Sequence, residues 1–176
     1  MRIFIFINFL LASTMILGLA ACEPEMISSG NDFQRKYSTA RRALEAGNYD
    51  SAIRSYEALI PNSGPLEPRL RLEYAHALLR AGRFDEATQV ANSLAAGSSG
   101  SARAAALAVS GTAQHESALV DIRGGTAGAS TVTLLRAADA ALSEMLVLDA
   151  GMDPLGTMAS RRSEIAQDLK RLGAVN

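Results

Sequence analysis

One eight-residue block occurs twice in this chain, and its two copies start 35 residues apart. AGNYDSAI covers residues 46–53, and AGRFDEAT covers residues 81–88. The glycine, the aromatic residue, the aspartate and the second alanine keep their places in both copies. Apolar residues recur at spacings of three or four on both sides of each block, which is typical of helices with one buried face. The sequence therefore predicts two successive helix–turn–helix units.

The conserved spacing within the block indicates how each turn is built. Gly47 and Gly82 stand where a helix ends and a left-handed backbone conformation is needed. Asp50 and Asp85 are placed to cap the next helix by accepting hydrogen bonds from backbone N–H groups. The second alanine of each block is small enough to let the second helix approach the first. These assignments predict two turns of the same geometry.

This pattern resembles the tetratricopeptide repeat (TPR), a helix–turn–helix unit with a period of 34 residues. The resemblance covers two units, from about residue 32 to residue 96. It implies an all-α fold, a TPR-like solenoid of helical hairpins within residues 32–176. The abundance of alanine, the strongest helix former, favours the same fold.

A third unit is predicted with an insertion. In the first unit the two small residues Ala40 and Ala52 are 12 apart, whereas Gly111 and Ala138 are 27 apart, so 15 residues are added. Glycine inside a helix costs about 1 kcal/mol relative to alanine, so we expect Gly111 to mark a close helix contact. The glycine-rich stretch at residues 123–130 is where we expect the insertion, as a flexible loop.

A last helix should cap the array, because repeat arrays need a terminal element with a polar outer side. Asp153 and Pro154 predict its start, as a capping residue followed by proline at the first helical position. Its apolar face is predicted to carry Leu155, Met158, Ile165, Leu169 and Leu172. Its outer face is predicted to carry Arg161, Arg162, Glu164, Lys170 and Arg171. The expected domain therefore has three hairpins and a capping helix.

The resemblance to TPR proteins also implies a binding surface, because the first helices of such repeats line a concave groove. Arginine and tyrosine are frequent anchors at interfaces, and both occur among the positions that would face this groove. The predicted groove residues are Tyr37, Arg41, Arg69, Leu72, His76, Leu79, Arg80, Thr112 and His115. The alternative is a helix face that is merely solvated.

The sequence carries no recognisable catalytic or metal-binding motif. His76 and His115 are the chain's two histidines, and neither has a histidine or carboxylate four residues further on; a zinc site needs three or four ligands. The glycines of residues 124–128 lack the lysine and the preceding strand of a phosphate-binding loop. We therefore expect that the protein is not an enzyme and binds no metal and no small-molecule substrate. The one cofactor-like group that we expect is a covalent lipid.

The first 22 residues resemble the leader of a bacterial lipoprotein. Arg2 is followed by an apolar stretch, and Leu19-Ala20-Ala21-Cys22 is similar to the lipobox of that class. Cys22 is the chain's one cysteine. The resemblance implies cleavage after residue 21, acylation of Cys22 by two or three chains, and a flexible tether over residues 22–31. The alternatives are an ordinary cleaved signal or an uncleaved anchor.

Together the two resemblances imply a lipid-anchored, periplasm-facing adaptor that binds another envelope protein. Glu23, rather than aspartate, favours the outer membrane by the sorting rule of enteric bacteria. Without the leader, 16 basic residues face 18 acidic ones, a balance that argues against nucleic acid as a partner. Similar TPR lipoproteins include assembly factors of tight-adherence pili and pilotins. Alternatives are an outer-membrane biogenesis factor, a cell-wall-associated structural lipoprotein or an envelope enzyme.

Replacing the lone cysteine tests the lipobox. Cys22→Ala should abolish fatty-acid labelling and release the protein from the membrane fraction, because no other thiol can receive the lipid. Metabolic labelling with radioactive palmitate, followed by membrane fractionation, measures both effects. A variant that is still labelled would contradict the lipobox.

Overall fold

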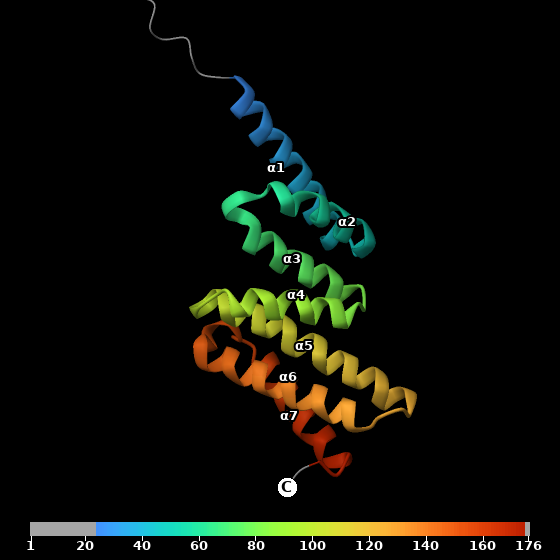
Figure 1. The fold of residues 1–176 in the computed structure, drawn as a ribbon. Coiled ribbons are helices and arrows are strands. Elements are labelled where there is room, and N and C mark those ends of the chain that lie inside the picture. The colour runs from blue at the N-terminus through green and yellow to red at the C-terminus, as the bar shows by residue number, and fades with distance from the viewer. Residues whose placement is uncertain (1–23, 175–176) are drawn as a thin grey trace, which may run out of the picture. The chain divides into compact units, whose positions relative to one another are not determined.

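The computed structural model describes residues 24–174, with side chains from Asn31 onward, so the leader and Cys22 lie outside the described residues. Within that range the chain folds into α-helices and short 3-10 turns without a strand (Figure 1). The helices are α1 (Pro24–Glu45), α2 (Tyr49–Leu59), α3 (Glu67–Arg80), α4 (Phe84–Ala96), α5 (Gly100–Gly124), α6 (Ala129–Leu148) and α7 (Thr157–Arg171). The predicted all-α class is confirmed.

The chain divides into two units, which are residues 1–35 and residues 36–176. The boundary falls within α1. In the first unit, α1 begins at Pro24. Residues 24–31 are therefore helical where the sequence analysis expected coil. Proline suits the first helical position, because the N–H group that it lacks has no partner there. The tether assigned to residues 22–31 stays a prediction.

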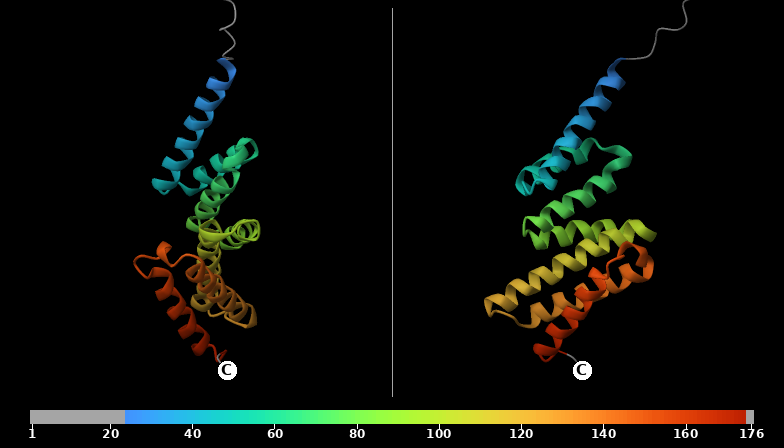
Figure 2. Two further views of the ribbon diagram at one scale, coloured as in Figure 1. Left: turned by 90° about the vertical axis from the view of Figure 1, so that its left-hand side faces the viewer. Right: turned by 180° about the vertical axis from the view of Figure 1, so that it is seen from behind.

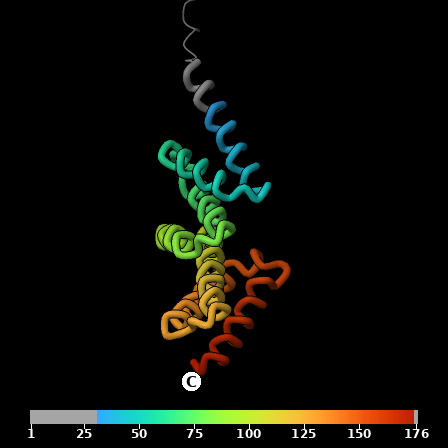
Figure 3. The backbone as a smooth tube through the Cα atoms, turned by 90° about the vertical axis from the view of Figure 1, so that its right-hand side faces the viewer, coloured from blue at the N-terminus to red at the C-terminus, as the bar shows by residue number. Residues whose placement is uncertain are grey.

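In the second unit, each helix from α2 to α7 packs against the next one along the chain. The first helices of the hairpins are α1, α3 and α5, and the second helices are α2, α4 and α6. Figures 2 and 3 show that α7 lies on the side of α5 opposite to α4. We call the side of α3 and α5 that turns away from α4 the inner face. The first helices and α7 border this face.

The two repeated turns have the same geometry, as predicted. Gly47 and Gly82 both have a φ of +77°, a conformation that glycine adopts without steric cost. The N–H of Asn48 donates to a carbonyl five residues earlier over 2.9 Å, and the N–H of Arg83 does the same over 2.9 Å. These bonds satisfy carbonyl groups that the helix end leaves open.

The predicted capping role of Asp50 and Asp85 is wrong. Each lies in the first turn of its helix, and the capping positions are held by Asn48 and Arg83, which form no side-chain capping bond. The aspartates stabilise the helix starts through their negative charge near the positive end of the helix dipole. Each helix begins two residues earlier than a capping aspartate would require, so the aspartate is its second residue.

The small residues lie at the predicted helix contacts. Ala52, Ala87 and Ala138 are fully buried. A Cβ atom built on Gly111 would lie 2.7 Å from Cγ of Leu142 and 3.1 Å from the carbonyl oxygen of Ala138. A gap of that size has no room for a methyl group. Glycine at position 111 is therefore required by the contact between α5 and α6.

The insertion in the third unit is helical rather than a loop, which corrects the prediction for residues 123–130. From Ala40 to the end of α1 there are five residues, whereas from Gly111 to the end of α5 there are 13. From the start of α2 to Ala52 there are three residues, and from the start of α6 to Ala138 there are nine. Both helices of this hairpin are thus about two turns longer. The connection itself is residues 125–128, and Gly125 ends α5 with a φ of +70°.

The last helix begins later than predicted. α7 starts at Thr157 after Gly156, which has a φ of +67°. Asp153 still caps the helix, because its carboxylate accepts hydrogen bonds from the N–H groups of Met158 and Ala159 over 3.0 Å each. The side chain reaches across the intervening turn. Leu155 therefore lies outside the helix and is 88% exposed, not part of the apolar face.

Two residues assigned to the outer side of α7 point inward instead. Arg161 pairs with Glu116 of α5, and Arg162 pairs with Asp139 of α6. One turn further along the helix, Ile165 is fully buried among Ala118, Leu135 and neighbouring apolar residues of α5 and α6. α7 is therefore fastened to the third hairpin by apolar contacts around Ile165 and by ion pairs of Arg161 and Arg162.

Gly111→Ala should lower the free energy of unfolding by about 1 kcal/mol. Helix propensity would favour alanine by about 1 kcal/mol, but overpacking against Leu142 and the carbonyl of Ala138 costs about 1–3 kcal/mol. Gly124→Ala, in the same helix, is the matched control, because its Cβ would lie at an ordinary 3.6 Å from Thr126. Urea unfolding followed by circular dichroism measures both. Equal stability of the two variants would contradict the close contact.

Candidate functional site

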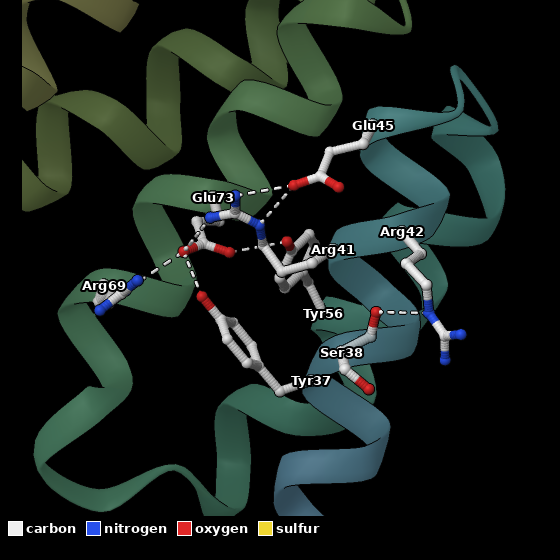
Figure 4. Close-up of polar contacts among 8 residues, drawn as sticks. All are labelled: Tyr37, Ser38, Arg41, Arg42, Glu45, Tyr56, Arg69 and Glu73. Atoms are coloured by element: carbon white, nitrogen blue, oxygen red, sulfur yellow. Dashed lines mark hydrogen bonds and ion pairs between the residues drawn. The ribbon is translucent and has the colours of Figure 1, made fainter.

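A largely enclosed carboxylate links α1, α2 and α3 (Figure 4). Glu73, in the middle of α3, has a side chain that is 12% exposed. The hydroxyl of Tyr37 donates to its Oε1 over 2.8 Å, and the hydroxyl of Tyr56 donates to its Oε2 over 2.7 Å. Arg69 and Arg41 approach Oε1 at 3.3 and 3.5 Å. Both oxygens of the carboxylate are therefore satisfied.

The electrostatics keep this carboxylate charged. Burial raises the pKa of Glu73, but hydrogen bonds from Tyr56, Tyr37 and Arg69 lower it by more, and the net shift is downward. Burial and the bond to Glu73 in turn raise the pKa of Tyr56 above its usual value. Tyr37 and the two arginines at Glu73 were predicted to bind a partner. The structure gives them internal contacts that tie α1, α2 and α3 together.

An open groove of about 490 Å³ lies further along the inner face. Its walls come from α3, the start of α4, α5 and α7. The apolar part of the lining is Leu79, Phe84, Ala108, Val109 and Met158. The polar part of the lining is His76, Arg80, Thr112, Glu116 and Arg161. This volume falls within the range of about 300–1,000 Å³ that is usual for ligand clefts, and we call this site the α3–α7 groove.

The two arginines of the α3–α7 groove differ in their charge balance. Arg161 donates to Glu116 over 2.8 Å, so its charge is compensated. Arg80 lies over the ring of Tyr49, 5.5 Å from its centre, and donates from Nε and Nη2 to the tyrosine hydroxyl over 3.2 and 2.9 Å. Among the described residues, Arg80 has no carboxylate partner.

His115 is not available to a partner, which corrects its predicted place in the groove. It is 1% exposed beneath α7. Arg161 donates to its Nδ1 over 3.0 Å. A guanidinium only donates, so Nδ1 is unprotonated and the ring proton sits on Nε2. Nε2 lies 3.6 Å from Oδ2 of Asp168, beyond hydrogen-bond distance, and has no partner.

The surroundings of His115 favour its neutral form. Burial lowers its pKa most, the positive charge of Arg161 lowers it further, and Asp168 and Glu116 oppose the change without reversing it. A second proton on the ring would meet the guanidinium of Arg161 at Nδ1. His115 is therefore part of the packing that holds α7 against α5.

The predicted groove residues thus divide into three groups. His76, Leu79, Arg80 and Thr112 come together in the α3–α7 groove. Leu72 is half-buried against the apolar cluster of Ala75, Ala91 and Val109. The residues around Glu73 and the buried His115 serve the fold.

Sequence reasoning did not anticipate Phe84, Met158 and Arg161 in the groove. Phe84 is the aromatic residue of the second repeated block, and the other two were assigned to the capping helix. The one available signal was the apolar stripe of the last helix, which showed that Met158 faces other helices but not which ones.

Residues 31–174 contain no group of three or more histidine, cysteine or acidic side chains that could hold a metal ion. In the helices between residues 24 and 171, none is both long enough and apolar enough to cross a bilayer.

Comparison with known proteins identifies the repeated part of the chain. A family model for the tetratricopeptide repeat matches residues 37–102. No curated protein and no solved structure matches the chain significantly. The matched range runs from the second half of α1 into the start of α5 and contains both repeated blocks. Solenoids of such repeats present extended surfaces that bind other proteins.

Acid should destabilise the protein through His115. Its pKa in the folded state lies below the ordinary value of about 6.5, so as the pH falls from 7.5 to 5.5 the unfolded chain binds a proton that the folded chain does not. Stability is full above pH 6.5 and is then lost by up to about 1.4 kcal/mol per pH unit. Urea unfolding at each pH measures the slope.

The matched comparison uses His76→Gln, in which His115 is the remaining histidine, and the double variant His76→Gln/His115→Gln. The double variant should show a nearly flat stability between pH 7.5 and 5.5. Equal slopes in the two variants would contradict a neutral, buried His115.

Proposed function

We propose that this chain, which contains tetratricopeptide repeats over residues 37–102, is a lipid-anchored adaptor that binds a protein of the bacterial envelope through the α3–α7 groove. The open groove on the inner face carries the proposal. Its lining mixes apolar surface with exposed His76 and Arg80. A surface of that kind binds a chain segment by apolar contact and fixes its register by polar contact.

The anchor would come from Cys22 and the leader before it. A protein held by two or more acyl chains stays on its membrane. Tethering raises the effective concentration of a binding site near membrane partners, so a groove of modest affinity becomes sufficient. Anchoring and groove are thus two parts of one proposed mechanism, with the lipid on the periplasmic side of the outer membrane.

The proposed partner belongs to an envelope assembly such as a pilus or a secretion apparatus. The size of the chain, the lipobox-like leader and the repeats resemble the lipoproteins that assist tight-adherence pili and secretin rings. An adaptor for such an assembly has to bind one protein while its own anchor fixes the place. The groove and the leader provide these two properties.

Site-specific photocrosslinking in intact cells tests this function. A benzoylphenylalanine placed at His76, in the groove, should crosslink to an envelope protein, which mass spectrometry then identifies. The same probe at Gln89, exposed on α4 outside the groove, is the matched control. The crosslink at His76 should weaken severalfold in the Cys22→Ala background, because the groove then leaves the membrane. Absence of a crosslink at His76, or equal crosslinks at both positions, would contradict the proposal.

A further inference from the structure

The α3–α7 groove carries one positive charge that the protein does not balance. Arg161 and Glu116 neutralise one another at 2.8 Å. Protein atoms around the ring lower the pKa of His76, which favours its neutral form. Arg80 donates to the hydroxyl of Tyr49 and pairs with no carboxylate among the described residues. A ligand that complements this groove therefore carries one negative group.

The guanidinium of Arg80 is already oriented for such a group. Its stacking over Tyr49 and its two bonds to the hydroxyl fix the plane of the guanidinium. An arginine has five N–H donors, and these two bonds leave the donors of Nη1 and one of Nη2. Those donors lie on the edge that binds a carboxylate in the bidentate manner. Little conformational freedom would be lost when a carboxylate binds.

Next to this charge the groove is apolar. Leu79, Phe84 and Ala108 line it from α3, α4 and α5, and Met158 lines it from α7. The sulfur of Met158 lies 3.9 Å from Oγ1 of Thr112, so the methionine is placed against α5. Methionine adapts to ligands of irregular shape. The groove can therefore take up apolar side chains beside the charged one.

We propose that the occupant of the α3–α7 groove is a short amphipathic peptide segment of a partner protein, whose aspartate or glutamate binds Arg80 while its apolar side chains pack on Leu79, Phe84 and Met158. This inference rests on the proposed function and adds the chemistry of the partner to it. A single isolated cation does not attract nucleic acid, which needs several phosphate contacts. One cation beside an apolar floor complements a peptide that carries one acidic side chain and several apolar ones.

Part of the groove lining lies outside the residues that match the repeat family. Met158 and Arg161 come from α7, and Thr112 and Glu116 come from the part of α5 beyond residue 102, where the family match ends. Arg161 is held by Glu116 and His115, so it frames the groove without adding net charge. The third hairpin and the last helix thus add a neutral ion pair to the lining and leave Arg80 as its unbalanced charge.

The test uses the full chain, purified in detergent, and three fluorescein-labelled peptides of 12 residues. The peptides share leucines at every third or fourth position and differ in one polar residue type, which is glutamate, glutamine or lysine. Fluorescence anisotropy should show that the glutamate peptide binds about threefold to fivefold more tightly than the glutamine peptide, the effect expected of one exposed ion pair. The lysine peptide should bind more weakly than both.

Charge reversal at Arg80 should invert this order. Arg80→Glu should prefer the lysine peptide, and Arg80→Lys should keep the preference for glutamate. Arg71→Gln, on the same helix but outside the groove lining, is the control and should behave like the unaltered protein. Circular dichroism of each variant shows that its fold is intact.

Other results of the peptide experiment would overturn either the role of Arg80 or the kind of occupant. Equal binding of the glutamate and glutamine peptides, or an order that Arg80→Glu leaves unchanged, would overturn the role of Arg80. Failure of all three peptides to bind would overturn the amphipathic occupant. Either result together with a crosslink at His76 would leave the adaptor function standing, whereas loss of that crosslink would remove the function itself.

Discussion

Close approach of paired helices at small residues is the constraint on which the structure depends. Ala52, Ala87 and Ala138 are buried where the second helix of a hairpin meets the first, and Gly111 leaves no room for a methyl group. Helices that approach so closely exclude water from their shared face. The polar positions of the first helices then have to face inward, where α3 and α5 form the floor of the α3–α7 groove.

The inner face is divided by how its charges are satisfied. At one end Glu73 is enclosed by tyrosines and arginines, and its net pKa shift keeps it ionised. At the other end the neutral ring of His115 is enclosed by α7. In both regions most of the enclosed polar groups form hydrogen bonds or ion pairs within the chain. Between them, the α3–α7 groove offers open volume beside Arg80, whose side chain also borders a cavity lined by Tyr49 and Asp50.

Local signals predicted the hairpins well, because each signal acts within a few residues. Gly47 and Gly82 allow the left-handed turn wherever the chain goes next, and the apolar spacing places helices on either side. The helical insertion was missed because glycines near residue 125 mark a turn but do not show that the residues before it stay helical. The place of α7 was missed for a different reason. It depends on the direction in which the chain returns after Gly156, so the burial of His115 and the position of Met158 follow from contacts between distant segments.

The long third hairpin shows how this kind of repeat can grow. Eight residues are added to the end of α5 and six to the start of α6, which are about 2.2 and 1.7 turns of an α-helix at 3.6 residues per turn. Both additions lie between Gly111 and Ala138 in the sequence, at the helix ends that are joined by the turn. Gly111 and Ala138 can therefore meet as their counterparts do, although the turn that joins their helices has moved about 12 Å further out along α5. A hairpin of this kind can thus lengthen at its turn without disturbing the helix contacts on the other side of Gly111 and Ala138.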